Sequence, residues 1–185
     1  MHSALVLASQ SPRRRELLTL AGFDFVVEPA NINEMRHAGE APDAYVQRLA
    51  LEKATAIADR FPEAIVLGAD TTVVLDGEAL NKPLDVEDAR RMLLALAGRA
   101  HEVHTALAVV SRSTSQVHLE TTRVFFSAIE TDELATYLDS GDPLDKAGAY
   151  GIQGYASRWI PRIEGDYFNV VGLPIAATVR LLRDL

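Results

Sequence analysis

The chain has 185 residues, of which 48% are hydrophobic and 24% are charged, so it is long enough to bury the core of one soluble domain. Its formal net charge of −8 argues against non-specific nucleic-acid binding, and its lack of cysteine excludes disulfides, thiolate nucleophiles and zinc–thiolate sites. The first residues do not have the pattern of a signal peptide, and no apolar run reaches the about 18 residues of a membrane-spanning helix. We therefore expect one domain over residues 1–185, located in the cytoplasm and without nucleic-acid or membrane partners.

The first predicted elements are a strand and a helix joined by a short loop. Residues 4–8 form an apolar run typical of a buried strand, Ser11 has the side chain of a helix N-cap, and Pro12 suits the first helical position. We expect the helix to end at Gly22, which favours a left-handed cap. The loop at Ser9 then brings free backbone N–H groups to the positive end of a helix dipole, which predicts an anion-binding site.

Three arginines, Arg13, Arg14 and Arg15, occupy the first turn of this helix, where the helix dipole disfavours cations. A bound phosphate would reverse the sign of that interaction, because the dipole and the guanidinium groups would both attract the anion. We therefore predict phosphate binding at this turn. The alternative is a basic turn that lies in solvent.

A long loop and a long helix follow. Residues 23–27 favour a short strand, and residues 28–41 are irregular and contain Glu34. A loop of this length in a compact domain often binds a ligand. Residues 42–60 have helical spacing of apolar side chains, and this predicted helix contains Lys53.

A second buried strand is predicted over residues 64–68, and Asp70 lies just beyond its expected end. The later elements that we expect are a hairpin joining residues 71–75 and 78–80, a helix capped by Asp85 and ended by Gly98, long strands over 101–110 and 117–129, a helix capped by Thr131 and ended by Gly141, a loop over 142–154, a strand over 159–164 and a helix from Pro174. Strands and helices alternate early and long hairpins come later, which predicts a mixed α/β sheet flanked by helices.

The position of Asp70 favours it as a site residue, because open α/β sheets bind ligands beyond the carboxyl ends of their strands. Ser9, Arg13 and Asp70 would share this edge if the two buried strands are parallel. The alternative for Asp70 is a cap or turn carboxylate. For Lys53 and Lys82 the alternative is a solvated side chain.

Cations and carboxylates at one edge predict phosphoryl chemistry through a divalent ion. Oxygen ligands suit Mg²⁺ or Mn²⁺, which also bind substrate phosphates and water. Such an ion polarises a phosphoryl oxygen and acidifies a bound water, and a nearby carboxylate takes the proton. The five histidines lack zinc-binding spacing, and we interpret them as structural or surface residues. The candidate cations are Arg13, Arg14, Lys53, Lys82 and Lys146, and the candidate carboxylates are Glu34, Asp70 and Asp145.

Six short blocks occur in one order along the chain. They are Ser9-x-Ser11-Pro12-Arg13-Arg14-x-Glu16-Leu17-Leu18, Gly68-Ala69-Asp70-Thr71, Lys82-Pro83, Asp145-Lys146-Ala147-Gly148, Gln153-Gly154 and Asn169-Val170-Val171-Gly172-Leu173-Pro174. With these blocks the chain resembles the Maf family, nucleoside triphosphate pyrophosphatases first named as septum-formation inhibitors. The resemblance extends from residue 4 to the C-terminal helix.

This resemblance implies an elongated, mixed α/β sheet with a nucleotide cleft, similar to inosine-triphosphate pyrophosphatases, and a homodimer. It also implies hydrolysis of a nucleoside triphosphate between the α and β phosphorus atoms. In the family, the aspartate matching Asp70 is the proposed proton acceptor. The residues matching Arg13, Thr71 and Gln153 mark the branch that acts on dTTP and UTP, whereas a sister branch prefers 7-methyl-GTP.

Our hypothesis is therefore a dTTP/UTP pyrophosphatase, with modified nucleotides as a further substrate class. Asp70 takes the proton, Glu34 and Asp70 bind Mg²⁺ or Mn²⁺, and Arg13 acts with Thr71 and Gln153 in substrate binding and selectivity. The expected phosphate-binding residues are Ser9, Ser11, Arg14, Lys53 and Lys82.

One residue departs from the family pattern: Asn81 stands where the family has glycine before Lys82. Because asparagine tolerates the left-handed backbone, we expect the turn to survive. Two other functions stay open, a non-catalytic nucleotide-binding regulator of septum formation and a metal-dependent phosphatase acting on another phosphorylated metabolite. A turnover assay separates the first from our hypothesis, and the identity of the released phosphate separates the second.

Overall fold

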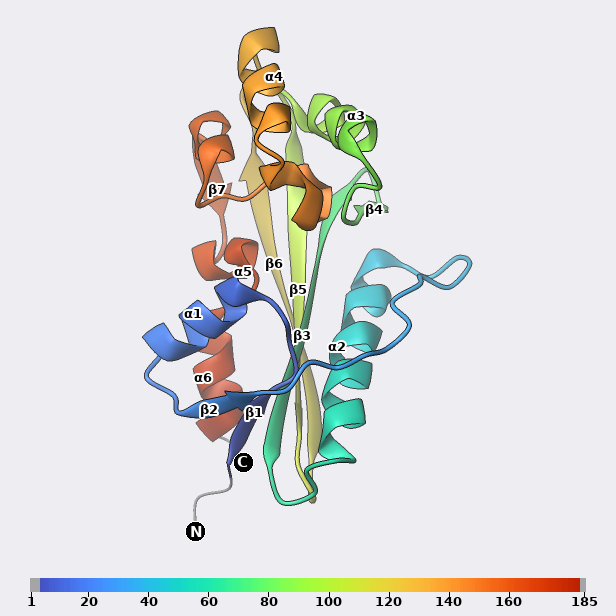
Figure 1. Cartoon of the computed structure of the whole chain (residues 1–185), viewed down its shortest axis with the longest axis vertical. Coiled ribbons are helices and arrows are strands. Elements are labelled where there is room, and N and C mark those ends of the chain that lie inside the picture. Colours follow the sequence, from blue (N-terminus) through green and yellow to red (C-terminus); the bar gives the residue numbers. More distant parts are fainter. Residues whose placement is uncertain (1–3, 184–185) are drawn as a thin grey trace.

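The computed structural model describes residues 4–183, which form a mixed seven-stranded sheet flanked by helices (Figure 1). The strands are β1 (Leu5–Leu7), β2 (Phe25–Val27), β3 (Ile65–Leu75), β4 (Glu78–Leu80), β5 (Ala100–Val110), β6 (Ser115–Phe125) and β7 (Arg162–Glu164). The helices are α1 (Pro12–Leu20), α2 (Pro42–Ala58), α3 (Val86–Leu96), α4 (Thr131–Asp139), α5 (Tyr167–Val171) and α6 (Ile175–Arg183). Three short 3₁₀ helices are η1 (Asp142–Asp145), η2 (Ala147–Ala149) and η3 (Tyr155–Trp159). The predicted fold class is confirmed.

The sheet has the strand order β2-β1-β3-β5-β6-β7, and β4 pairs with β3 outside this path. The strand β1 is parallel to both β2 and β3, which meets the condition under which Ser9, Arg13 and Asp70 share one edge of the sheet. The strands β3, β5 and β6 are antiparallel and have 11 residues each. These three long strands give the sheet its elongated shape (Figure 1).

Alternate residues of the strands point to opposite faces of the sheet, and each face has its own helices. On one face, Val66 and Ala106 pack with residues of α2. On the other face, Leu67 and Leu107 pack with residues of α1 and α6. Figure 1 shows α2 on one side of the sheet and α1, α5 and α6 on the other. Farther along the sheet, a third cluster around Trp159 joins residues of α3 and α4.

The helix α2 lies very close to β3 because small residues face each other at their contact. A Cβ atom at Gly68 would lie 2.3 Å from the backbone oxygen of Ala50 and 3.0 Å from the Cβ of Ala54. Only glycine therefore fits at this position of the strand. The close approach also sets how far a side chain of α2 must extend to reach the sheet.

Four expectations from the sequence differ from the structure. Asp70 lies inside β3, because residues 64–68 and 71–75 form one strand whose ladder to β5 is continuous. Thr131 is the first residue of α4 and does not cap it, since Glu130 holds the cap position without a side-chain hydrogen bond. The segment 142–154, expected to be a loop, contains the 3₁₀ helices η1 and η2. Of the expected strand over 159–164, only Arg162–Glu164 forms a strand, β7. The short helix α5 had no signal in the apolar pattern.

A first prediction concerns the close contact of α2 with β3. Replacing Gly68 with alanine should destabilise the protein by about 1–3 kcal/mol, because the added methyl group overlaps backbone that has no free space. Urea unfolding of Gly68→Ala beside the parent protein measures this loss. An unchanged free energy of unfolding would contradict the close packing described here.

A second prediction concerns His101, a buried residue of β5. Its Nε2 lies 2.7 Å from the Tyr150 hydroxyl, its ring packs edge-on against Phe126, and its Nδ1 has no hydrogen-bond partner among the described residues. Burial lowers the pKa of His101 to about 4 from the ordinary value of 6.5. The folded protein thus holds the neutral ring, whereas the unfolded chain takes up a proton below pH 6.5.

This difference should remove about 2 kcal/mol of stability between pH 7 and pH 5. The free energy of unfolding of His101→Phe should fall less steeply over this range than that of the parent protein. A matching substitution of the partly exposed His118 serves as the control. Equal slopes for His101→Phe and the parent would contradict a buried neutral His101.

Candidate active site

The loop between β1 and α1 has the geometry that its sequence predicts. The Ser11 hydroxyl accepts a hydrogen bond from the Arg14 backbone N–H at 3.4 Å, and Pro12 begins the helix. The buried Ser9 hydroxyl accepts from the Ser11 N–H at 3.2 Å. The side chains of Ser9 and Ser11 thus shape the turn, and the helix dipole points its positive end into the same region.

Arg14 is bound on several sides by the protein. Its Nε donates to the Gly172 carbonyl at 2.9 Å, and its Nη1 donates to the Ala69 carbonyl at 2.8 Å and to the Ser9 hydroxyl at 3.3 Å. Its Nη2 donates to the Thr71 hydroxyl at 3.0 Å. A guanidinium group has five N–H donors, so one remains for a ligand. The helix, the strand β3 and the segment at Gly172 are therefore held together at this one side chain.

The charge of Arg14 also acts on Asp70. The guanidinium donates to groups of the residues on each side of Asp70, Ala69 and Thr71. Burial lowers the pKa of Arg14, and the negative charge of Asp70 acts in the opposite direction. The arginine-rich turn and Asp70 therefore lie together in the structure, although they are about 56 residues apart in sequence.

Lys53 joins two carboxylates that come from distant segments. Its Nζ lies 2.7 Å from Asp70 Oδ1 and 2.9 Å from Glu34 Oε1. The side chains of Lys53 and Asp70 are only 10% and 11% exposed, whereas that of Glu34 is 54% exposed. The alternative of a solvated lysine at position 53 is wrong, because α2 packs Lys53 against β3. Burial raises the pKa of Asp70, and the positive charges of Lys53 and Arg14 partly offset this effect.

Thr71 faces away from Lys53, since it is the next residue of the strand after Asp70. Its hydroxyl lies 2.9 Å from the Thr105 hydroxyl, which donates to the Asn169 carbonyl at 2.9 Å. Thr71 is thus bound between Arg14 and β5. Because Thr105 uses its proton for Asn169, the Thr71 hydroxyl donates to Thr105 and accepts from Arg14, which leaves it one lone pair to accept a hydrogen bond from a ligand.

Arg13 reaches the segment that carries the fourth sequence block. Its Nη1 lies 3.5 Å from Asp145 Oδ2, and the other oxygen of this carboxylate lies 2.7 Å from Lys146 Nζ. Lys146 also lies 2.8 Å from Asp142 Oδ1, an acid that the sequence did not single out. The Arg13 side chain is 31% exposed, and its one ion pair within residues 4–183 is exposed, so it is available for an anion.

Lys82 and Gln153 are exposed, and neither side chain forms a hydrogen bond or ion pair with another residue of the range 4–183. The structure therefore does not join them to the Lys53 cluster. The expectation of a left-handed backbone at Asn81 is wrong, because Asp76 and Ala149 are the non-glycine residues with positive φ in the described part of the chain. Asn81 directly follows β4.

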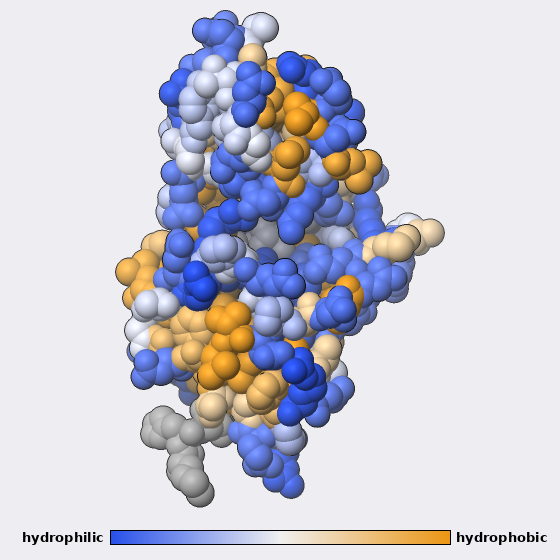
Figure 2. Space-filling view, viewed as in Figure 1, coloured by the Kyte–Doolittle hydropathy of each residue, from blue (hydrophilic) through white to orange (hydrophobic). Residues whose placement is uncertain are grey.

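The surface near these segments is hollowed (Figure 2). Figure 2 shows one face of the molecule hollowed near its centre, with hydrophilic side chains around the hollow. The view is that of Figure 1, in which the N-terminus of α1 and the 3₁₀ turns η1 and η2 lie on either side of this region. The Arg13–Asp145 ion pair links the same two segments.

The two carboxylates on Lys53 also fit a divalent cation. Glu34 and Asp70 each place one oxygen within 3 Å of the same atom, Lys53 Nζ, so their side chains converge. No group of three or more histidine or acidic residues is close enough to hold an ion within residues 4–183. Mg²⁺ commonly uses one or two carboxylates and completes its shell with water and substrate phosphates. The donor set therefore fits an ion that arrives with a phosphate ligand.

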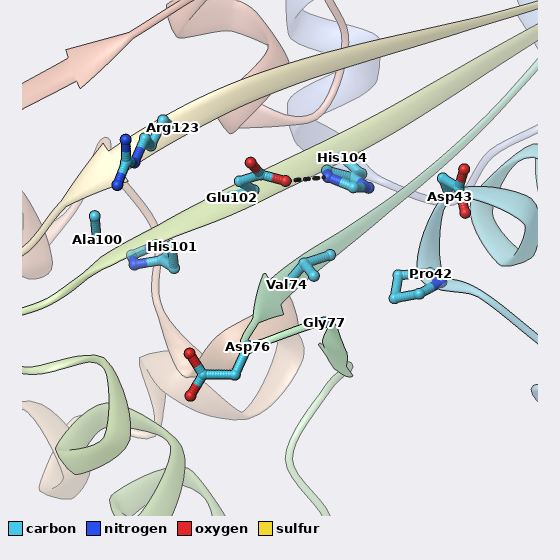
Figure 3. A pocket seen from close by; sticks show the side chains of 10 residues that line it. All are labelled: Pro42, Asp43, Val74, Asp76, Gly77, Ala100, His101, Glu102, His104 and Arg123. Carbon is cyan, nitrogen blue, oxygen red and sulfur yellow. Dashed lines mark hydrogen bonds and ion pairs between the residues drawn. The ribbon is translucent and has the colours of Figure 1, made fainter.

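A separate cavity of about 400 Å³ lies beyond the N-terminus of α2 (Figure 3). The carboxylates of Asp43, Asp76 and Glu102 line it, together with His104 and Arg123. Three acids against one permanent cation make this cavity unsuitable for a triphosphate. None of the sequence-predicted site residues lines it.

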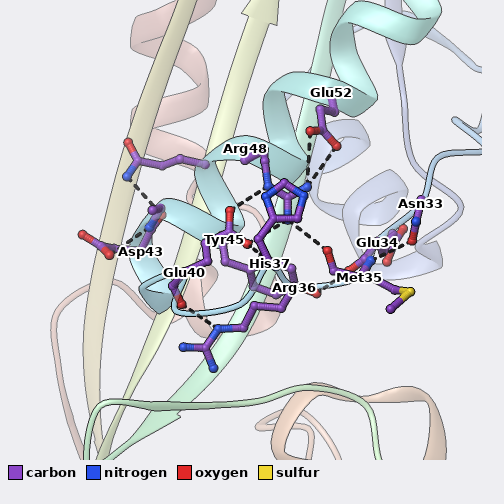
Figure 4. A network of polar contacts seen from close by, with 12 residues as sticks. Asn33, Glu34, Met35, Arg36, His37, Glu40, Asp43, Tyr45, Arg48 and Glu52 are labelled. Atoms are coloured by element: carbon purple, nitrogen blue, oxygen red, sulfur yellow. Dashed lines mark hydrogen bonds and ion pairs between the residues drawn. The ribbon is translucent and has the colours of Figure 1, made fainter.

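Sequence reasoning missed the residues that hold the Glu34 loop against α2 (Figure 4). Tyr45 donates to the Glu34 carbonyl at 2.8 Å, and Arg48 donates to the Met35 carbonyl at 3.1 Å. Arg48 also binds the Glu40 carboxylate at 2.6 Å and lowers the pKa of Glu40 to about 2. The sequence signals these contacts only by placing Tyr45 and Arg48 on the early turns of the helix predicted over residues 42–60.

The chain is similar in sequence to proteins of named activity. Over 179 residues the chain is 53% identical to a dTTP/UTP pyrophosphatase of Koribacter versatilis, which covers 97% of this chain and 93% of the relative. Over 182 residues it is 49% identical to a dTTP/UTP pyrophosphatase of Vibrio cholerae, with 98% and 97% covered.

Solved structures show the same fold at low sequence identity. A HAM1 protein from Coxiella burnetii matches with a TM-score of 0.57 and 14% identity over 100% of both chains. The Ham1 protein of Staphylococcus aureus matches with a TM-score of 0.50 and 15% identity over 67% of this chain and 72% of its own. The family model described as Maf-like protein matches residues 4–185. The chain therefore belongs to the Maf family.

Proposed function

We propose that this protein hydrolyses dTTP and UTP between the α and β phosphorus atoms, releasing the nucleoside monophosphate and pyrophosphate. The observation that carries the proposal is the buried Asp70, held by Lys53 at 2.7 Å beside the arginine-rich turn. Relatives about 50% identical over nearly the whole chain have the same named activity.

In this proposal the triphosphate binds along the turn between β1 and α1. Positive charge there would come from Arg13, from Lys53 and from the backbone of the turn. Lys82, which is exposed on the turn after β4, would have to reach the triphosphate from outside the Lys53 cluster. Arg14 has one N–H left for a phosphate oxygen, so its main contribution is to hold Ser9 and Thr71 in place.

Glu34 and Asp70 would hold a Mg²⁺ or Mn²⁺ ion. When bound, this ion would polarise a phosphoryl oxygen and make the attacking water more acidic. The oxygen of that water forms a bond to the α phosphorus, and Asp70 takes the proton that the water loses. The bond between the α phosphorus and the oxygen of the pyrophosphate leaving group breaks. A raised pKa makes Asp70 a stronger base than an exposed aspartate, and Lys53 keeps it ionised before the reaction.

Selectivity for the pyrimidine base would come from Gln153 and Thr71. Gln153 is exposed, and its amide offers both a donor and an acceptor to the edge of a uracil or thymine ring. Thr71 is bound to Arg14 and Thr105, so its effect on selectivity would pass through the position of Arg14.

Three further statements belong to the proposal: residues 1–185 form one domain, the protein is a homodimer, and it acts in the cytoplasm. No helix within residues 4–183 is long and apolar enough to cross a membrane. The net charge of −8 supports the absence of a nucleic-acid partner. Light scattering after gel filtration tests the dimer. No observation favours the non-catalytic alternative.

The proposed reaction makes a specific prediction about products. With dTTP and Mg²⁺ or Mn²⁺ the protein should release dTMP and pyrophosphate, and Asp70→Asn should reduce turnover by at least about 100-fold because general-base catalysis is lost. Chromatography of the products, without any added pyrophosphatase, measures both. Asp76→Asn, which removes an exposed acid of the β3–β4 turn, is the matched control and should keep normal turnover. Orthophosphate as the first product would rule out this reaction.

The pair of Lys53 and Asp70 makes a prediction about pH. The ammonium group of Lys53 lowers the pKa of Asp70, so Lys53→Met should raise that pKa further. The acid limb of the pH profile of kcat/KM should then move to higher pH, in addition to a general loss of rate. Arg99→Met, far from the pair, should leave the limb in place. An acid limb that does not move in Lys53→Met would show that Asp70 is not the titrating base.

A further inference from the structure

The residue pair Tyr45 and Asn81 lies between the segments that carry the proposed site. Tyr45 is on the first turn of α2 and Asn81 follows β4. Asn81 Nδ2 donates to the Tyr45 hydroxyl at 3.4 Å, and that hydroxyl donates to the Glu34 carbonyl at 2.8 Å. One hydroxyl group therefore connects the Glu34 loop with the turn that precedes Lys82.

Asn81 makes two more contacts, each with a different segment. Its Oδ1 accepts a hydrogen bond at 2.9 Å from the hydroxyl of Thr72, a fully buried residue two positions after Asp70 on the same face of β3. Its backbone carbonyl accepts from the Gly148 N–H at 3.1 Å, next to the segment with Asp145 and Lys146. The side chain and backbone of Asn81 thus hold three segments in register.

The hydroxyl groups of Tyr45 and Thr72 are buried, whereas the Glu34 carboxylate is exposed. Burial raises the pKa of Tyr45 to about 12, so its hydroxyl keeps the proton that it donates to Glu34. The Tyr45 side chain is 5% exposed, and Thr72 has no exposed surface. Water therefore does not readily replace these hydrogen bonds when one partner is removed. The Glu34 side chain, in contrast, is 54% exposed, and its ion pair with Lys53 requires the loop backbone to stay in place.

We propose that Tyr45 and Asn81 are positioning residues: their shared hydrogen bonds hold Glu34 against Lys53 and hold the Lys82 turn against β3, so that both segments face the triphosphate together. The pair acts through Glu34 and Lys82 and does not itself contact substrate. This inference rests on the proposed function for its kinetic consequences. Its structural consequence, that disturbing one segment loosens the other, does not depend on any activity.

The test uses the conservative variant Tyr45→Phe, which removes one hydroxyl, together with Asn81→Ala and the double variant. Tyr150→Phe is the matched control, because it also removes the hydroxyl of a buried tyrosine. That hydroxyl bonds to His101 and is not part of the Tyr45–Asn81 hydrogen bonds. Asn81→Ala keeps the backbone bond to Gly148. Urea unfolding confirms that each variant folds.

Hydrogen exchange read by mass spectrometry is the first measurement. Tyr45→Phe and Asn81→Ala should each speed exchange about three- to tenfold in residues 31–41, and Tyr150→Phe should not. The effect of Asn81→Ala is the decisive one, because within residues 4–183 the hydrogen bonds of Asn81 reach this loop through Tyr45. Unchanged exchange of residues 31–41 in Asn81→Ala would overturn the proposal, whether or not the protein hydrolyses dTTP.

Kinetics provide the second measurement. Each single variant should raise the half-saturating Mg²⁺ concentration and lower kcat/KM for dTTP about three- to tenfold, and the double variant should lose no more than the worse single variant. Tyr150→Phe should lower stability without changing the dependence on Mg²⁺. Losses that multiply in the double variant would mean that Tyr45 and Asn81 act separately. A parent protein without activity would contradict the proposed function. Hydrogen exchange would still test whether the hydrogen bonds of Tyr45 and Asn81 hold the Glu34 loop.

Discussion

The site is organised by one buried ammonium group. Lys53 places a positive charge 2.7 Å from Asp70 and 2.9 Å from Glu34, where the side chains of Lys53 and Asp70 are almost fully removed from water. Removing both charges from water costs free energy that their attraction alone does not always offset, so such a pair is weak support for stability. The pair is better explained by chemistry, because it keeps a buried carboxylate ionised next to a region of positive charge.

The rest of the fold provides what this pair requires. The absence of a side chain at Gly68 lets α2 approach β3, so that Lys53 reaches Asp70. Arg14 donates to the Ala69 carbonyl and to the Thr71 hydroxyl on either side of Asp70, and so connects this part of β3 to the turn between β1 and α1. Tyr45 brings the loop of Glu34 to the same place. Three segments far apart in the sequence thus supply one basic and two acidic groups at a single point.

Local patterns predicted the parts of the site that local chemistry determines. Ser11 and Pro12 begin α1 as their side chains require, and the parallel pairing of β1 and β3 follows from two short apolar runs. The strand β3 was divided at Asp70, because a charged residue interrupts the apolar pattern and nothing local shows that Lys53 will pair with it. The position after an apolar run singled out Asp70 and the family resemblance gave its role, whereas the Lys53–Glu34 contact depends on tertiary packing that no local pattern records.

The backbone conformation of Asn81 was also not predictable from local sequence. Its residue type suits a left-handed backbone, but its φ is not positive, and its side chain accepts a hydrogen bond from Thr72 and donates one to Tyr45. The long-range partners decided the conformation, as tertiary context often does for a residue with weak local preference.

The most direct test of the account is the position of an ion and a triphosphate in a crystal of this protein grown with Mn²⁺ and α,β-imido-dTTP, a substrate analogue that is not cleaved. We expect the anomalous signal of manganese between the carboxylates of Glu34 and Asp70, with the triphosphate on the turn at residues 9–13. Manganese or triphosphate on the opposite face of the sheet, or in the acidic cavity beside His104, would contradict the account.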